Sequence, residues 1–253
     1  MIRLLVKYIL AAAFRDRLFL GFFGMLLIGV SLSLFFGSSI ITETDQFSLV
    51  FAAGGLRLVG VLTLVLFIVF YMRRSFDTRD VEYMLSRPVS RLQFLMSHLF
   101  AFMVIAAIMT GLIAATLLLM PLNMSASGIV LWGASIFTEL AIIAAVSLFF
   151  ALVLSSAVTA SMMVICFYVL SRLIGSILGI IASGVESGLM ALMEKTMLVI
   201  SVFIPRLDLI GQTSWLLYGT ENSIDFGFIA LQGSIFCGLF FAAAFFDLSR
   251  RQF

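Results

Sequence analysis

The stretch Leu18-Phe-Leu-Gly-Phe-Phe-Gly-Met-Leu-Leu-Ile-Gly-Val-Ser-Leu-Ser-Leu-Phe-Phe36 contains no charged residue, and its length decides the fold. An α-helix needs about 20 apolar residues to cross a hydrocarbon core of about 30 Å. Similar runs recur along the chain, and the predicted spans are 18–36, 49–72, 92–119, 129–154, 158–181 and 226–246. The sequence therefore predicts an all-α polytopic membrane protein, a single transmembrane domain over 1–253 with six transmembrane helices.

The composition agrees with this fold class. Of the 253 residues 63% are hydrophobic and 11% are charged, and the mean hydropathy is +1.22. A soluble domain needs more polar surface than this to remain in solution. Cys166 and Cys237 both fall inside apolar spans, so we expect buried thiols rather than a disulfide framework.

The first 17 residues predict an amphipathic helix that lies in the membrane interface. Apolar residues recur at helical spacing opposite Arg3 and Lys7; they are Leu4, Leu5, Tyr8, Ile9 and Ala12. Basic residues are spread through the segment and no small-residue cleavage site follows, which argues against a signal peptide.

The stretch 183–225 is predicted to form re-entrant or interfacial helices on the outer side. Its apolar run 197–204 is too short to cross a membrane and is stopped by Pro205. The alternative is that 189–204 tilts or extends into a seventh span.

The basic residues predict the orientation, because cytoplasmic loops carry an excess of lysine and arginine. With six spans, eleven of the fifteen face one side: Arg3, Lys7, Arg15, Arg17, Arg73, Arg74, Arg79, Arg87, Arg91, Arg250 and Arg251. Lys195 and Arg206 face the other side, whereas Arg57 and Arg172 fall within spans. Both termini are therefore expected in the cytoplasm.

The charged segment 73–91, between the second and third spans, contains residues that typically begin and end helices. Asp77 can cap a short helix, and Pro88 closes that helix within about three turns. Ser90 and Gln93 have the spacing of a capping box, which predicts that a new helix begins there. On physical grounds the segment is either a connector that sets the angle between two spans or a rigid element that docks a cytoplasmic partner.

The run Glu82-Tyr-Met-Leu85-Ser-Arg-Pro88-Val-Ser-Arg91 resembles the cytoplasmic segment of the type-2 (ABC-2-type) family of ABC transporter permeases. The layout of the whole chain is similar to that family too. The resemblance implies a coupling helix that sits in a groove of a separate ATP-binding subunit. The residues that it assigns to this contact are Glu82, Leu85, Arg87, Pro88 and Arg91.

The resemblance also implies function and partners. The chain would be the permease subunit of an ATP-driven exporter in the bacterial cytoplasmic (inner) membrane, paired with a second permease copy or homologue. ATP and Mg²⁺ would be bound by the partner subunit, so no cofactor is expected in this chain. The alternative is a membrane anchor or assembly subunit that docks a cytoplasmic ATPase without transporting anything.

Residues typical of catalysis are scarce in the sequence. It has no Walker-type G-x-x-x-x-G-K-[ST] run, so ATP hydrolysis is expected from a separate subunit and the chain is not expected to be an enzyme. His98 is the sole histidine, which excludes paired-histidine ligation and predicts no metal site. We expect His98 to be a packed or interfacial residue at the start of the third span.

Three charged residues fall inside predicted spans. Glu139 and Arg172 lie roughly 15 Å from the outer surface and Arg57 about 12 Å, at 1.5 Å per residue. Charges inside a membrane are costly and usually pair or line a polar cavity. Arg57, Glu139 and Arg172 are therefore candidates for an ion pair in the bundle, or for a basic site on a substrate path.

Overall fold

The computed structural model describes residues 2–39, 44–78, 90–120, 124–182, 195–196, 203–220 and 224–250. Within these ranges the chain is all-α, with eight helices and no strand. The helices are α1 (Ile2–Arg15), α2 (Leu18–Ser38), α3 (Thr44–Asp77), α5 (Arg91–Leu118), α6 (Ala126–Val153), α7 (Ala157–Ala182), α9 (Ser214–Tyr218) and α10 (Phe226–Arg250).

Six of the helices are long and apolar enough to cross a membrane, as the sequence predicts: α2, α3, α5, α6, α7 and α10. Helix α3 is longer than its predicted span 49–72, because residues 73–77 of the predicted cytoplasmic segment continue the helix. Asp45 in its first turn and Arg74 in its last turn complement the helix dipole and favour this extension.

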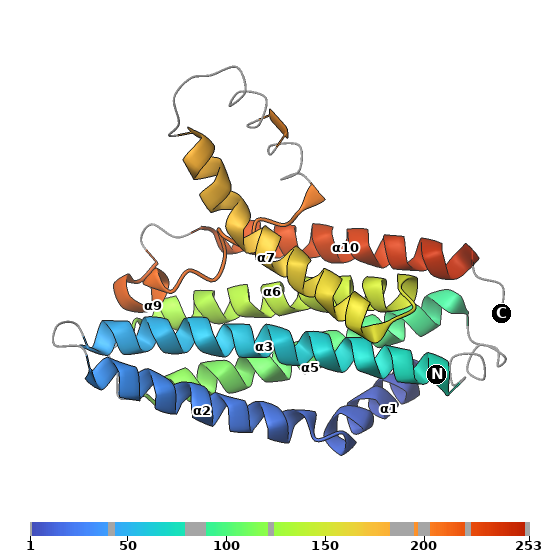
Figure 1. The fold of residues 1–253 in the computed structure, drawn as a ribbon, viewed down its shortest axis with the longest axis horizontal. Helices are drawn as coiled ribbons and strands as arrows, with labels where there is room; N and C mark the ends of the chain where they lie inside the picture. The colour runs from blue at the N-terminus through green and yellow to red at the C-terminus, as the bar shows by residue number, and fades with distance from the viewer. Residues whose placement is uncertain are drawn as a thin grey trace.

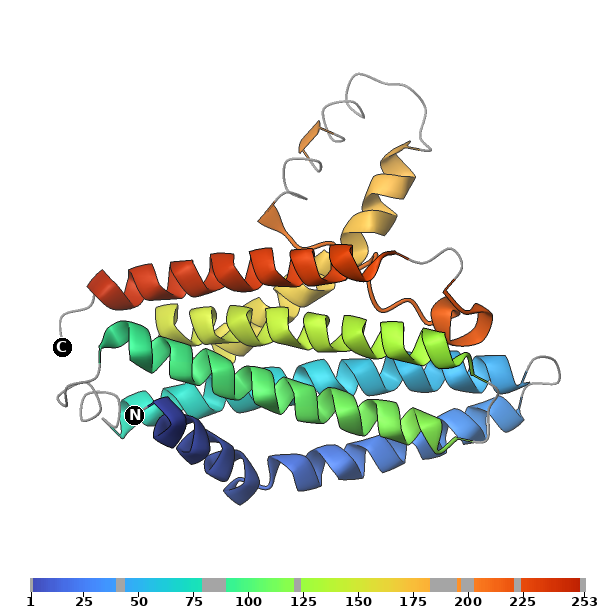
Figure 2. The ribbon, with the colours of Figure 1, turned by 180° about the vertical axis from the view of Figure 1, so that it is seen from behind.

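Five of these helices run side by side along the long axis of the molecule, and α7 crosses them at a clear angle (Figures 1 and 2). Both termini lie at one end of the bundle, which we call the terminal end; α9 lies at the opposite end. The C-terminal half of α7 leads away from the bundle in both views.

Helix α6 forms the centre of the bundle and contacts α3, α5, α7, α9 and α10. Nearly all of its second half is buried, from Glu139 to Leu148. By contrast, α2 and α7 expose most of their apolar residues, which is the expected state for helices that face lipid.

An aromatic layer joins α3 to α5 near the terminal end. The ring of Tyr71 packs edge-on against Phe102, and His98 lies beside both Tyr71 and Phe94. His98 Nδ1 lies 2.9 Å from the carbonyl oxygen of Phe94, which can only accept, so Nδ1 carries a proton. His98 is thus a packed core histidine, in agreement with the sequence prediction.

The structure forms α1 where the sequence predicts a helix, and its placement in a membrane interface stays a prediction. Ile9 and Ala12 of the predicted apolar face are buried together with Val6 and Ala13, whereas Leu4 and Tyr8 are exposed. The helix packs against α5 through small side chains, which turns Leu4 and Tyr8 outward. The thiol positions also differ from the expectation, because Cys237 is buried while Cys166 is exposed.

Candidate functional site

The three intramembrane charges come together in the structure. Arg57 Nε lies 3.8 Å from Glu139 Oε1, and Arg172 Nη1 lies 3.8 Å from Glu139 Oε2. The Glu139 side chain is fully buried, while Arg57 and Arg172 are 15% and 21% exposed. These residues come from α3, α6 and α7, so one carboxylate links three helices.

The cluster lies at one level because each residue occupies a similar place in its helix. Arg57 and Glu139 are each about 20 Å along the helix from the first residues of α3 and α6, and Arg172 is about 15 Å before the end of α7. Arg57 lies farther from the start of its helix than from the start of the predicted span, because α3 begins at Thr44 and the span at Leu49. All three side chains lie well inside the apolar part of the bundle.

The arginines also hold a loop at the end opposite the termini. Arg57 Nη1 donates to the carbonyl oxygen of Gly211 at 2.8 Å. Arg172 Nη1 donates to the carbonyl oxygens of Leu207 and Ile210, the latter at 2.9 Å. Leu207 and Ile210 are fully buried. Residues 207–211 therefore form a turn that enters the bundle and is fixed by two intramembrane cations.

Two glycines make this close approach possible. Gly211 has a φ of +68°, and a β-carbon there would lie 3.3 Å from both Arg57 Nη1 and Glu139 Oε2. A β-carbon on Gly175 of α7 would lie 2.0 Å from Asp208 Oδ2. Arg206 donates to Asp208 at 2.8 Å, and this hydrogen bond raises the pKa of the Arg206 guanidinium. The turn is thus anchored from both α3 and α7.

The cluster has an excess of one positive charge, since two cations face one carboxylate. Among the described residues, neither Glu139 oxygen nor Arg57 Nε has a hydrogen-bond partner. Distances of 3.8 Å are beyond hydrogen-bonding range, so the attraction inside the cluster is ionic. Such an arrangement can hold three helices and a loop together, and it can attract an anion that reaches the exposed arginine surfaces.

The terminal end contains a second group of arginines, on either side of residues 79–89. Arg73 donates to the carbonyl oxygen of Leu154, in the turn between α6 and α7, at 3.3 Å. Arg74 pairs with Asp16, after α1, at 2.5 Å. Arg91 Nη1 donates to the carbonyl oxygens of Leu248 and Ser249, each at 2.8 Å. We call Arg73, Arg74 and Arg91 the three anchor arginines.

The start of α5 is fixed by the predicted capping box. The Ser90 hydroxyl accepts from the backbone N–H of Gln93 at 3.2 Å, and the Ser90 N–H donates to Gln93 Oε1 at 3.4 Å. This part of the sequence prediction is confirmed. Asp77 is the last residue of α3 and lies 3.8 Å from Arg73 of the same helix.

Most of the predicted docking residues lie outside the described part of the chain: Glu82, Leu85, Arg87 and Pro88. Arg91 is described, and its contacts with the last turn of α10 were not expected from the sequence. Its role in partner contact stays a prediction. No alternation or spacing pattern signals these contacts, because Arg91 and α10 are far apart in the chain.

The turn at 207–211 was not expected from the sequence, which predicted re-entrant or interfacial helices over 183–225. In the described part of that stretch, Pro205 is followed by a turn and then by the short helix α9. Nothing in the sequence indicated which cations the carbonyl oxygens of the turn would meet. Comparison with known proteins adds no assignment: no protein-family model and no curated protein matches the chain. The family resemblance of 82–91 therefore remains a prediction.

Proposed function

We propose that this chain is the membrane-spanning subunit of an ATP-driven transporter of the ABC type, with ATP hydrolysis supplied by separate cytoplasmic subunits. The observation that carries the proposal is the set of contacts that the end of α3 and the start of α5 make with other elements. The helices before and after residues 79–89 are tied through the three anchor arginines to α1, to the α6–α7 turn and to α10. A passive connector between two adjacent helices does not need ties to three other elements.

In this proposal the segment 79–89 docks in a groove of the ATPase, through Glu82, Leu85, Arg87 and Pro88. Closure of the ATPase dimer on ATP displaces the segment as a rigid body. The anchor arginines then transmit the displacement to α3 and α5 directly, and to the α6–α7 turn and α10 through backbone carbonyls. Direct hydrogen bonds suit this task because they resist separation more stiffly than apolar contacts do.

In this proposal the displacement that starts at residues 79–89 reaches the intramembrane cluster of Arg57, Glu139 and Arg172. Arg57 of α3 and Arg172 of α7 both face Glu139 and both donate to carbonyl oxygens of the turn 207–211. A movement of α3 relative to α7 changes these contacts, so the turn is positioned to open or close the end opposite the termini. The substrate would cross between this subunit and a second permease copy or homologue, in the direction of export.

The experiment is co-purification of the ATPase with wild-type and variant permease at matched expression. Glu82→Ala and Arg87→Ala each remove one member of an interfacial charge pair, which costs about 2–5 kcal/mol of binding. Leu85→Asp places an unpaired charge where an apolar anchor is expected, so it should bind still less. Arg15→Ala, an exposed basic residue at the end of α1, is the matched control.

In this proposal Glu82 and Arg87 contribute to binding and not to folding, so the free energy of unfolding of the two alanine variants should stay within about 0.5 kcal/mol of the wild-type value. Retention of the partner and of its stimulated ATP hydrolysis in all three variants would show that 79–89 is only a connector. If the partner binds but hydrolysis drives no transport, the chain is an anchor or assembly subunit instead.

A further inference from the structure

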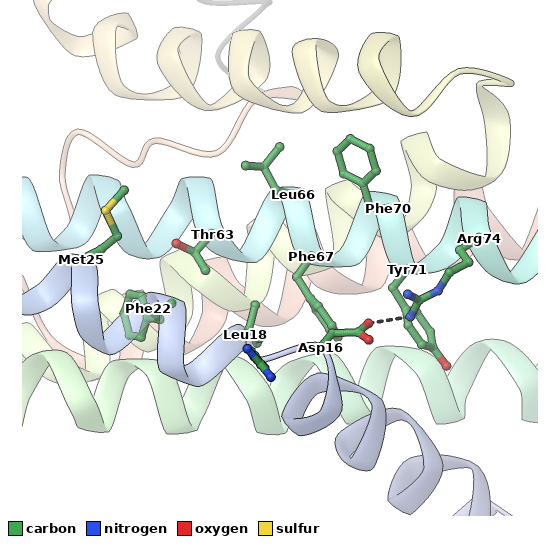
Figure 3. Close-up of a pocket in the computed structure, with 12 residues that line it drawn as sticks. Asp16, Leu18, Phe22, Met25, Thr63, Leu66, Phe67, Phe70, Tyr71 and Arg74 are labelled. Carbon is green, nitrogen blue, oxygen red and sulfur yellow. Dashed lines mark hydrogen bonds and ion pairs between the residues drawn. The ribbon is translucent and has the colours of Figure 1, made fainter.

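A groove between α2 and α3 lies far from the charge cluster and is not used in the proposed mechanism. Its volume is about 720 Å³, and its apolar walls include Phe22 and Met25 of α2 with Leu66 and Phe70 of α3. That volume is within the range of small-molecule sites, about 300–1,000 Å³. Figure 3 shows Asp16 and Arg74 at one end of the groove, and Met25 and Thr63 toward the other.

The groove exists because α2 and α3 are close together at one end and diverge at the other (Figure 1). At the end opposite the termini the Ser33 hydroxyl donates to the carbonyl oxygen of Ser48 at 2.5 Å. At the terminal end α1 and α2 are joined at Arg17, whose φ of +55° breaks the helix and redirects the chain. Side chains of the described residues leave the space between the helices unfilled.

The dimensions of the groove match one leaflet of a bilayer. It extends along α3 from Arg74 to Thr63, about 16 Å at 1.5 Å per residue. This is close to half of a hydrocarbon core of about 30 Å. One end lies at the level where α1 joins the bundle, and the other lies at mid-membrane depth.

We call the end of the groove that is lined by Asp16, Arg17 and Arg74 its mouth. The charge at the mouth identifies the class of ligand. Arg74 is neutralised by Asp16 at 2.5 Å, whereas Arg17 is exposed and has no ion pair among the described residues. The mouth therefore has an excess of one positive charge beside an apolar groove. Arginine presents several N–H donors to a phosphate, and basic pockets between transmembrane helices favour anionic headgroups.

We propose that the α2–α3 groove binds the acyl chain of an anionic phospholipid, with the headgroup phosphate at Arg17. A zwitterionic headgroup brings its own cation and gains less from the excess charge. The site does not depend on the transporter proposal; it requires only that α2 and α3 cross a membrane. It does place the lipid against α3, the helix that leads directly into residues 79–89.

Two glycines of α2 allow a matched test. A β-carbon on Gly21 or on Gly24 would meet no atom within 4 Å, so both positions accept a larger side chain without a clash. Gly21 lines the groove and Gly24 does not. Gly21→Leu should fill the groove, while Gly24→Leu adds the same side chain outside it. For the mouth, Arg17→Gln removes the proposed headgroup contact, and Arg3→Gln removes an exposed charge elsewhere at this end.

The measurement is lipid retention by the purified full chain in detergent, read by native mass spectrometry after titration with phosphatidylglycerol or with phosphatidylcholine of the same acyl chains. We expect one tightly retained phosphatidylglycerol per chain and weaker retention of phosphatidylcholine. Gly21→Leu should lose this lipid and Gly24→Leu should keep it. Arg17→Gln should bind about five- to tenfold more weakly, and Arg3→Gln should bind as wild type does.

Several results would overturn the proposal. Equal retention in Gly21→Leu and Gly24→Leu would place the lipid elsewhere. Equal binding of the two lipids, or no effect of Arg17→Gln, would remove the headgroup assignment. Glycerophosphate without an acyl chain should not compete at the same concentration; if it does, the mouth binds anions without using the groove.

Discussion

Glu139 is the residue on which the intramembrane contacts converge. It is fully buried, yet its two oxygens face Arg57 and Arg172 from 3.8 Å rather than from hydrogen-bonding distance. Both arginines instead donate hydrogen bonds to carbonyl oxygens of the turn 207–211. The carboxylate therefore acts through its charge, offsetting two cations that the loop carbonyls alone would not neutralise.

Removal of that charge gives a prediction for folding. Glu139→Gln should destabilise the protein by about 3–5 kcal/mol, because it leaves two buried arginines without an anion. The double variant Glu139→Gln/Arg172→Gln should recover part of that loss, since one of the unpaired cations is gone. The measurement is the unfolding midpoint in detergent for the four members of this cycle.

A neighbouring residue provides the control for this cycle. Ser135 is buried one turn earlier in α6, and its hydroxyl bonds to the carbonyl oxygen of Leu131 in its own helix. Ser135→Ala should therefore cost much less than Glu139→Gln. If the effects of Glu139→Gln and Arg172→Gln add strictly in the double variant, Glu139 and Arg172 are not coupled and have independent roles.

At the scale of elements, the contrast between local and distant contacts explains what the sequence could predict. The six spans and the capping box at Ser90 depend on residues close together in the chain, and both are confirmed. The periodicity of α1 did not predict which of its residues pack against the bundle, because the burial of Val6 and Ala13 depends on α5, which is distant in the sequence. The contact of Arg91 with α10 depends on two helices from opposite ends of the sequence.

Ser90 and Arg91 are adjacent, but they stabilise different helices, and this gives a prediction at the element scale. Ser90→Ala removes the cap of α5 and should cost about 1 kcal/mol, with faster amide exchange in the first turn of α5. Arg91→Gln replaces the guanidinium that donates to Leu248 and Ser249 with a shorter, uncharged amide that should not reach both carbonyl oxygens, so exchange should accelerate about tenfold near the end of α10.

Hydrogen-exchange mass spectrometry separates the two effects, and each variant serves as the control for the other. Faster exchange in α10 with Ser90→Ala, or unchanged exchange in α10 with Arg91→Gln, would show that the anchor contact does not hold that helix. In that case the transmission from residues 79–89 to α10 would lose its support.

For the whole molecule, the arrangement of the helices constrains the topology more strongly than any single span does. Both termini lie at one end of the bundle, together with the end of α3 and the start of α5 (Figures 1 and 2). The end of α2, the start of α3 and helix α9 lie at the opposite end. An even number of crossings satisfies this arrangement, whereas a seventh span at 189–204 would place the last helix in the reverse direction.

Site-specific tags in intact cells test this topology. Tags inserted after Ser39 and after Thr220 should be reached by an impermeant reagent from outside, whereas tags after Thr78 and at the C-terminus should react only after the membrane is opened. The reason is the charge distribution, since the six-span prediction assigns eleven basic residues to the cytoplasmic side and two to the outer side. An externally labelled C-terminus together with a protected tag after Thr78 would require an odd number of crossings, and it would place Arg250 and Arg251 on the side that the charge rule disfavours.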